Sequence, residues 1–391
     1  MAKTARRDAG TGALYQRKSD GLWIGYVTLP NDPVTGKRRR KVVSAKTQAA
    51  ANAKLRKLRA ELDKAGDLPT SSPTLERWLA TWLDRIAAPR LKPRTLATYR
   101  GYIEQYIVPT IGRHRLERLT PDHVRQLHHA ITGRGLSSTT ALQAHRILVV
   151  ALRDAMREGK VTRNVATLVD APSKAVASRG ALTAEDARAL LLSVAQDEQA
   201  AVRWGLALMA GLRQGEALGL TRDAVDLDAG VITVEWQLQR LPRGTTIPAG
   251  QEAERVHGGL WLTRPKSRAG WREVPIAPPL AEMLRRYLAY RPVGMGGLIL
   301  YRDGGRPLDP SDDSRAWHAA LKAAGLPRVP LHSARHTTAT LLYELGVAER
   351  TRVAILGHSS ATVTAGYTHV SDREAADAMG RLGMLLLPTR S

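Results

Sequence analysis

The sequence predicts a multidomain protein: a small three-stranded sheet with one helix, then an all-helical bundle, and last a mainly helical domain that carries a small antiparallel sheet. Three observations support this fold class. The chain has 391 residues, more than a single hydrophobic core usually supports. Residues 66–73 and 172–180 are rich in Gly, Pro and Ser, as linkers are. Aromatic and β-branched residues typical of strands precede the first linker, whereas apolar residues at helical spacing follow it. We therefore expect domains at residues 1–66, 74–173 and 180–391.

The first domain combines three strand-like segments with a helix rich in Ala and Lys. The expected order is strands at residues 14–17, 22–29 and 37–47, followed by a helix at residues 48–65. The hairpin between the second and third strands carries five consecutive cations, Lys37, Arg38, Arg39, Arg40 and Lys41. Such a run can neutralise the phosphates of a nucleic acid. Charges that keep an exposed edge strand from aggregating would give the same pattern, so both interpretations stay open.

The second domain is predicted to hold four helices. Apolar residues recur every three or four positions in the first two, which places them on one face of each helix. These residues are Leu75, Trp78, Leu79, Trp82, Leu83 and Ile86 on the first helix, and Leu96, Tyr99, Ile103 and Tyr106 on the second. Thr120 and Pro121 begin the third helix as N-cap and first helical residue, and Ser138 begins the fourth. We expect the Trp and Tyr side chains to form the core rather than a platform for stacked bases.

The third domain begins with a helix signal at Thr183, because Asp186 three residues later can complete a capping box. Strand-like residues at 231–234 are expected to pair with segments around residues 261–262 and 272–276. Helices are expected at residues 184–195, at 199–211 and over most of 279–380. The domain is therefore predicted to be mainly helical around a small sheet.

The net charge of +23 is concentrated before the third domain. Residues 1–66 carry 16 Lys and Arg against 5 Asp and Glu, residues 74–179 carry 18 against 8, and residues 180–391 carry 25 against 22. This asymmetry favours the binding of a polyanion by the first 179 residues, with nucleic acid as the main candidate. Solubility, or a generally basic proteome, would also produce it.

Composition excludes several classes of protein. The chain has no cysteine, which excludes a disulfide framework, a Cys-ligated zinc site, an iron–sulfur cluster and a thiol nucleophile. No apolar run reaches the roughly 18 residues of a membrane span, and the first residues lack the apolar core of a signal peptide. We therefore expect a cytoplasmic protein with no membrane partner.

Three motifs in the third domain combine basic or nucleophilic side chains. Arg213 follows an apolar helix between two glycines, and Glu216 lies one helical turn later, where it can pair with that guanidinium. His332 and Arg335 share one helix face at positions i and i+3. The third motif contains His358, which Tyr367 follows nine residues later. Taken singly, each motif is as typical of a structural contact as of a functional site.

Two other kinds of site fit these residues less well. His332 and His336 have the spacing of a zinc protease, but Ser333 stands where that motif has glutamate. Residues 357–361 approach the elbow of a serine hydrolase but lack its final glycine and a preceding strand.

Together and in this order, the motifs resemble those of the tyrosine recombinase family, specifically the phage-type integrases. The matching segments are residues 211–216, 265–276, 332–337, 356–360 and 367–370. The resemblance extends to the whole chain, because family members commonly carry a helical core-binding domain before the catalytic one. Many also have a small N-terminal domain of sheet and helix that binds arm sites. The resemblance therefore implies an arm-binding domain, a core-binding domain and a catalytic domain, in that order.

In the catalytic domain implied by this resemblance, Arg213 and Arg335 clamp the non-bridging oxygens of a DNA phosphodiester and offset the charge of its transition state. Tyr367 would be the nucleophile, giving a covalent 3′-phosphotyrosine and a free 5′-hydroxyl. Because the covalent link stores the bond energy, the reaction needs no ATP, no metal and no other cofactor.

Four further residues receive roles from the same resemblance. Lys266 would protonate the leaving oxygen, His332 would assist proton transfer at the tyrosine, and His358 would bind the phosphate through a hydrogen bond. Glu216 would orient the neighbouring arginine.

The resemblance implies a site-specific recombinase of a phage or other mobile element, which integrates DNA at core-type and arm-type attachment sites. It would act as a homotetramer on DNA, in the nucleoid of a bacterial host, with or without a directionality factor and a DNA-bending host protein. Two alternatives stay open: a type IB topoisomerase, and a non-catalytic DNA-binding regulator with the same fold. The separate basic domain favours the integrase over the topoisomerase, and the complete set of six catalytic side chains disfavours the regulator. The apolar residues 384–388 would dock on a neighbouring protomer or pack on their own domain.

Overall fold

The computed structural model of the chain describes residues 14–31, 36–66, 73–175, 180–247, 250–265, 271–357 and 371–387. By its internal contacts the chain divides into two compact units, one of residues 1–90 with 98–175 and one of residues 91–97 with 176–391. The boundary between residues 175 and 176 falls inside the predicted linker at 172–180. The further division of the first unit, between residues 66 and 74, stays a prediction.

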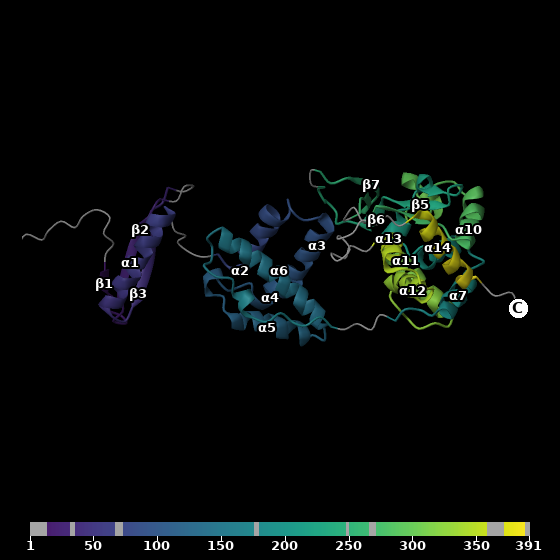
Figure 1. Ribbon diagram of the computed structural model, residues 1–391. Helices are drawn as coiled ribbons and strands as arrows, with labels where there is room; N and C mark the ends of the chain where they lie inside the picture. The colour runs from purple at the N-terminus through teal and green to yellow at the C-terminus, as the bar shows by residue number, and fades with distance from the viewer. Residues whose placement is uncertain are drawn as a thin grey trace, which may run out of the picture. The chain divides into compact units, whose positions relative to one another are not determined.

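The N-terminal part of the first unit is an antiparallel sheet covered on one face by a helix (Figure 1). The strands lie in the order β1-β2-β3, and their bounds are Leu14–Gln16, Trp23–Leu29 and Arg39–Ala45. Helix α1 (Gln48–Ala65) has the predicted bounds, with Thr47 as its N-cap and Gly66 at its end. Four apolar side chains form the core between sheet and helix: Val27, Leu29, Leu55 and Leu58.

The rest of the first unit is a helical bundle. Its α-helices are α2 (Leu75–Thr81), α3 (Pro93–Tyr102), α4 (Val108–Ile111), α5 (Pro121–Thr132) and α6 (Ser138–Arg157). Trp78 and Trp82 are buried, and their indole N–H groups donate to the Ala151 carbonyl and the Asp154 carboxylate at 3.1 and 2.9 Å. The prediction that the aromatic residues form the core is therefore confirmed for the two tryptophans, whereas Tyr99 and Tyr106 are only half-buried. Thr120 caps α5 and Ser138 begins α6, both as predicted, and Ser137 is the N-cap of α6.

The second unit is mainly helical, as predicted. Its α-helices are α7 (Ala184–Ser193), α8 (Glu198–Leu208), α9 (Gln214–Leu218), α10 (Pro278–Ala289), α11 (Pro310–Ala323), α12 (His332–Glu344), α13 (Glu349–Leu356) and α14 (Asp372–Leu386). Thr183 and Asp186 form the predicted capping box at the start of α7. One core joins the helices, with Trp204 and Trp317 packed edge to face at its centre. None of the described helices is long and apolar enough to cross a membrane.

Among the described residues, the second unit contains two three-stranded antiparallel sheets where one was predicted. The first sheet has the order β4-β5-β9, and its strands are β4 (Val225–Asp226), β5 (Val231–Val234) and β9 (Arg272–Pro275). The second has the order β6-β8-β7, and its strands are β6 (Gln237–Arg240), β8 (Leu260–Thr263) and β7 (Ala253–His257). The predicted pairing of residues 231–234 with 272–276 is confirmed. The predicted pairing with residues 261–262 is wrong, because these residues lie in β8. Leu260 and Leu262 pack with Leu238 of β6 in a separate small core.

The apolar end of the chain packs on its own domain as far as the structure describes it. Leu382 and Leu386 of α14 are fully buried in the main core of the second unit, while Met384 between them is 65% exposed. Helix α14 contacts α7, α10, α13 and β9. For the described part of this segment, the structure therefore favours packing on its own domain over docking on a neighbour.

Shortening Leu386 to Ala should destabilise the protein by about 2–5 kcal/mol, because the substitution leaves a cavity in the core. Met384→Ala in the same helix is the matched control and should change stability by less than about 0.5 kcal/mol, because that side chain is exposed. Guanidinium denaturation of the full chain, followed by tryptophan fluorescence, measures both. Equal effects of the two substitutions would contradict the packing of α14 on its own domain.

Candidate active site

The buried Glu216 carboxylate lies at the centre of the described part of the site. One oxygen accepts a hydrogen bond from Nη1 of Arg213 at 2.6 Å, and the other accepts one from the Arg213 backbone N–H at 2.9 Å. Arg272, which begins β9, donates to the same two oxygens from Nη1 and Nη2, at 3.2 and 2.9 Å. One carboxylate thus binds two guanidinium groups, and it links the start of α9 to a strand 56 residues further along the chain.

The surroundings of Glu216 keep its carboxylate ionised. Burial raises its pKa, but the hydrogen bonds and positive charge of Arg272, together with the charge of Arg213, outweigh burial and lower the pKa to about 2. The side chain therefore carries its negative charge at neutral pH and well below the pH at which a carboxyl group usually titrates.

Arg335 is the most deeply buried arginine of the predicted catalytic set. It lies in the first turn of α12, where its guanidinium donates to the carbonyl of Gly211 at 2.8 Å and to that of Leu356. Gly211 has a φ of +61°, and a Cβ at this position would lie 2.6 Å from a methyl carbon of Leu356. Only glycine fits this turn, which brings the start of the first motif against the second.

Arg213 is more accessible, with 37% of its side chain exposed. Its Nη2 donates to the carbonyl of Gly357 at 2.9 Å, at the left-handed residue that ends α13. Arg213 and Arg335 therefore bind consecutive carbonyls, those of Gly357 and Leu356. These carbonyls directly precede His358 in the chain, so the structure brings the backbone of the third motif to both arginines.

The site is electropositive, because three guanidinium groups lie around one carboxylate. Burial, and then the positive charges of Arg213 and Arg272, lower the pKa of Arg335 to about 9, while Glu216 opposes the shift. Arg335 still carries its charge at neutral pH, in a position where further negative charge would stabilise it. The arrangement therefore suits an oxyanion such as a phosphate, and it disfavours a metal cation.

The structure places half of the predicted catalytic residues. His332 is exposed at the start of α12, one turn before Arg335, and its ring meets that of His336 edge to face with the centroids 4.8 Å apart. The other three predicted residues, Lys266, His358 and Tyr367, lie outside the described residues. Across the part of the chain that the structure covers, no three His, Asp or Glu side chains gather as a metal site would require.

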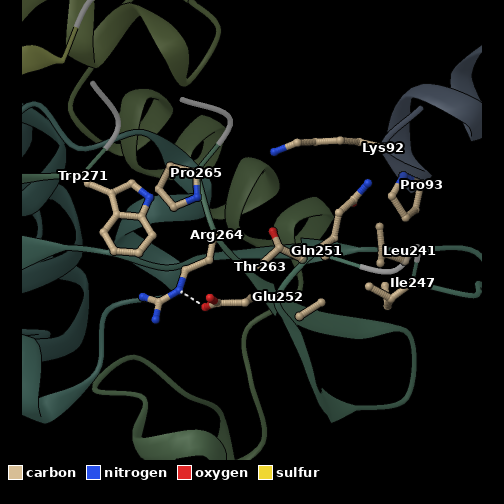
Figure 2. A pocket seen from close by; sticks show the side chains of 12 residues that line it. Lys92, Pro93, Leu241, Ile247, Gln251, Glu252, Thr263, Arg264, Pro265 and Trp271 are labelled. Atoms are coloured by element: carbon tan, nitrogen blue, oxygen red, sulfur yellow. Dashed lines mark hydrogen bonds and ion pairs between the residues drawn. The ribbon is translucent and has the colours of Figure 1, made fainter. Parts of the chain in front are cut away.

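Arg264 is engaged by side chains of its own region. It forms ion pairs with Glu235 and Glu252 at 2.9 and 2.7 Å, and its guanidinium lies over the rings of Trp236 and Trp271 at 3.9 and 4.5 Å. Figure 2 shows Arg264 with Glu252 and Trp271. A basic residue held in this way is poorly suited to donate a proton to a substrate. These contacts disfavour Arg264 as the proton donor of this segment, and the role of Lys266 stays a prediction.

Arg272 is a site residue that the sequence motifs do not single out. It lies within the matching segment 265–276, but no role is predicted for it. The alternation of buried side chains along this strand is the signal that could have identified Arg272 as a buried residue. Val274 and Ile276, two and four residues later, are buried on the same side of the chain as Arg272. A buried arginine needs an acidic partner, and Glu216 is that partner.

The five cations of the N-terminal hairpin differ in their position in the sheet and in their exposure. Lys37 and Arg38 precede β3 and are exposed. Within β3, Arg39 and Lys41 are half-buried, opposite core residues of β2, whereas Arg40 is exposed and stacks on Tyr26 at 4.8 Å. The sheet face away from α1 thus presents one of the three strand cations together with exposed apolar side chains, namely Tyr15 and Val42.

Replacing Glu216 with Gln should lower stability at neutral pH, because it leaves Arg272 buried without a negative partner. The pKa of Glu216 in the folded state, about 2, lies below its usual value of 4.5. The contribution of this carboxylate is therefore complete above pH 4.5 and is lost as the pH falls toward 2. This contribution to the free energy of unfolding is on the order of 3 kcal/mol. We expect the difference between wild type and variant in denaturation midpoint to shrink over this range.

Glu282→Gln is the control for this titration, because Glu282 pairs with Arg285 on the surface, where both side chains are mostly exposed. Its effect should be small at every pH. A difference between wild type and Glu216→Gln that stays constant from pH 4.5 to 2 would contradict the lowered pKa.

Comparison with known proteins identifies similar chains along most of the sequence. An integrase of Saccharopolyspora erythraea is 29% identical, over 97% of this chain and 98% of its own length. A tyrosine recombinase XerC-like protein of Caldanaerobacter subterraneus is 25% identical, over 92% of this chain and 95% of its own. Among solved structures, the Tn1549 transposon integrase in complex with a circular intermediate DNA has a TM-score of 0.64 at 21% identity, over 80% of this chain and 100% of that one. A lambda integrase tetramer bound to a Holliday junction has a TM-score of 0.57 at 21% identity, over 90% of this chain and 97% of that one.

The structural similarity confirms the predicted fold class, since both solved relatives are integrases that align with most of the chain. Two family patterns match the sequence in the predicted order. The N-terminal SAM-like domain of phage integrases matches residues 74–131, and the phage integrase family pattern matches residues 181–374. Together they cover more than half of the chain, and the second includes every candidate catalytic residue. The chain belongs to the phage integrase family of tyrosine recombinases, enzymes that cleave and rejoin DNA.

Proposed function

We propose that this recombinase integrates DNA at attachment sites through a covalent 3′-phosphotyrosine intermediate formed by Tyr367. The observation that carries the proposal is the convergence of Arg213 and Arg335 on the carbonyls of Gly357 and Leu356. These two arginines come from motifs 122 residues apart in the sequence, and they meet directly before the histidine of the third motif. A pair of guanidinium groups held in this way can bind two non-bridging oxygens of one phosphodiester.

In the proposed reaction, the hydroxyl oxygen of Tyr367 forms a bond to phosphorus while the bond from phosphorus to the 5′-oxygen breaks. The two arginines stabilise the negative charge of the pentavalent transition state. The strand remains attached to the tyrosine through its 3′-phosphate, and the 5′-hydroxyl is released. Attack by a 5′-hydroxyl of the partner strand reverses the steps and rejoins the DNA.

Proton transfers complete the proposed cycle. His332 takes up the tyrosine proton, directly or through water, and its exposed position at the start of α12 leaves it accessible to a substrate. Lys266 supplies a proton to the departing 5′-oxygen, while His358 donates a hydrogen bond to the phosphate. Glu216 orients Arg213, a role supported by the two hydrogen bonds between them.

The first two domains are proposed to bind DNA. Their excess of positive charge suits contacts with the phosphate backbone. For arm-type sites we propose the outer face of the β1-β2-β3 sheet together with Lys37, Arg38 and Arg40. Arg39 and Lys41 emerge on the side covered by α1, where they can reach phosphates only at the edge of the sheet.

The assembly is proposed to be a homotetramer on core-type DNA, by analogy with the lambda integrase tetramer bound to a Holliday junction. A directionality factor and a DNA-bending host protein are further proposed partners. The proposed location is the cytoplasm of a bacterial host, at the nucleoid.

Tyr367→Phe should abolish the covalent adduct with DNA while leaving DNA binding intact, because only the nucleophilic oxygen is removed. The assay incubates the full chain with nicked suicide DNA that contains its attachment core and detects the adduct on a denaturing gel. Tyr290→Phe is the matched control, since Tyr290 is 95% exposed at the end of α10, and it should form the adduct at the wild-type rate.

The same assay discriminates the alternatives. An adduct that persists in Tyr367→Phe would show that another residue is the nucleophile. Relaxation of supercoiled DNA without site dependence would favour the topoisomerase. A wild-type protein that binds attachment DNA but forms no adduct on any of it would favour the regulator.

Arg40→Gln should weaken binding of the full chain to arm-type DNA and reduce the slope of log affinity against log salt by about 1, because one phosphate contact is lost. Lys57→Gln removes the same charge from an exposed position on α1, on the other side of the sheet, and should change the slope far less. Fluorescence anisotropy over a salt series measures both. Equal effects of the two substitutions would show that the outer sheet face is not the contact surface.

A further inference from the structure

Gln214, the residue directly after Arg213, ties the start of α9 to another helix. Its side-chain amide nitrogen lies 2.7 Å from the Pro310 carbonyl, 2.9 Å from the Asp313 carboxylate and 3.0 Å from the Ser314 hydroxyl. All three partners lie within the first five residues of α11. The carbonyl and the carboxylate can only accept hydrogen bonds, so the amide must present its nitrogen to them.

The point to which Gln214 is attached is itself rigid. Asp313 accepts two hydrogen bonds, both 2.8 Å long, from Nε and Nη2 of Arg203 in α8. The two side chains are 3% and 2% exposed. A buried bidentate pair of this kind has a single favourable geometry, so α8 and α11 hold the Asp313 carboxylate in one place.

Helix α9 depends on such outside contacts because it contains only five residues. A helix of this length has no stability of its own in water. The direction of the Arg213 side chain is set by the backbone of Arg213 and Gln214, and the guanidinium itself is partly exposed. A shift of the first turn of α9 would therefore move Arg213 relative to the buried and separately anchored Arg335.

We propose that Gln214 is a positioning residue for Arg213. Through Asp313 and Arg203 it holds the first turn of α9 in register with α11, so that the Arg213 guanidinium meets the scissile phosphate. The inference rests on the proposed role of Arg213, and it assigns a function in the reaction to a residue whose side chain binds α11 of the same domain.

The test compares Gln214→Met with wild type in the full chain, because Met keeps the length of the side chain and removes its hydrogen bonds. Single-turnover formation of the covalent adduct is measured on two suicide substrates. One has an ordinary phosphodiester at the cleavage position, and the other has a methylphosphonate, in which a methyl group replaces one charged oxygen. Since the arginines act on negative charge, a misplaced Arg213 should matter far less for the neutral substrate.

We expect Gln214→Met to slow cleavage of the phosphodiester by about 10- to 100-fold. Cleavage of the methylphosphonate should fall by less than about threefold, with DNA affinity unchanged. Gln214→Glu is a second variant of almost the same shape, in which the carboxylate repels Asp313, and it should show the same selectivity. Gln199→Met is the matched control: Gln199 of α8 accepts hydrogen bonds from the Tyr287 hydroxyl and the Tyr301 backbone N–H rather than from α9 or α11, and their loss should change the two rates equally or not at all.

Equal slowing of both substrates by the Gln214 variants would assign Gln214 a purely structural role, and wild-type rates on both would remove any role. Either result overturns the inference. Arg213→Ala is run in parallel to separate this failure from failure of the proposed function. If Arg213→Ala cleaves the phosphodiester at the wild-type rate, the clamp itself is wrong.

Discussion

The ion pairs of the Glu216 carboxylate are the interaction on which the geometry of the active site depends. The carboxylate is buried, it binds Arg272 with both oxygens, and it accepts two hydrogen bonds from Arg213. Without it, three guanidinium groups would share a largely buried space with no negative partner, at a cost of several kcal/mol. The start of α9, the start of β9 and the first turn of α12 can approach one another because this one negative charge lies among them.

The arginines of the site differ in exposure, and the difference suits two tasks. The side chains of Arg335 and Arg272 are buried, and they bind backbone carbonyls at the end of α13 and at the turn before α9. They hold these segments in place. Arg213 is partly exposed, so a phosphate can reach it by displacing water. The second unit is nearly neutral overall, yet its site is electropositive, because a few charges are concentrated at one place.

Local signals in the sequence were sufficient to predict most of the helices. Thr120 and Thr183 begin α5 and α7 because a threonine hydroxyl binds a backbone N–H three residues later, an interaction that needs no other part of the chain. Strand pairing was predicted only in part. Residues 261–262 pair with β6 and β7 because Leu260 and Leu262 fit the small core around Leu238. Alternation within one strand cannot show which core that strand will meet.

The candidate site was likewise predicted only in part. The order of the motifs, through their resemblance to the tyrosine recombinases, predicts Arg213 and Arg335 as oxyanion ligands and Tyr367 as the nucleophile, and these roles stay proposals. Only the tertiary structure decided that Arg272 shares Glu216, and that Gln214 is tied to Asp313, 99 residues away. The physical reason is burial. A charged or polar group that leaves water must find its partner among the groups the fold places beside it, and those neighbours come from distant parts of the chain.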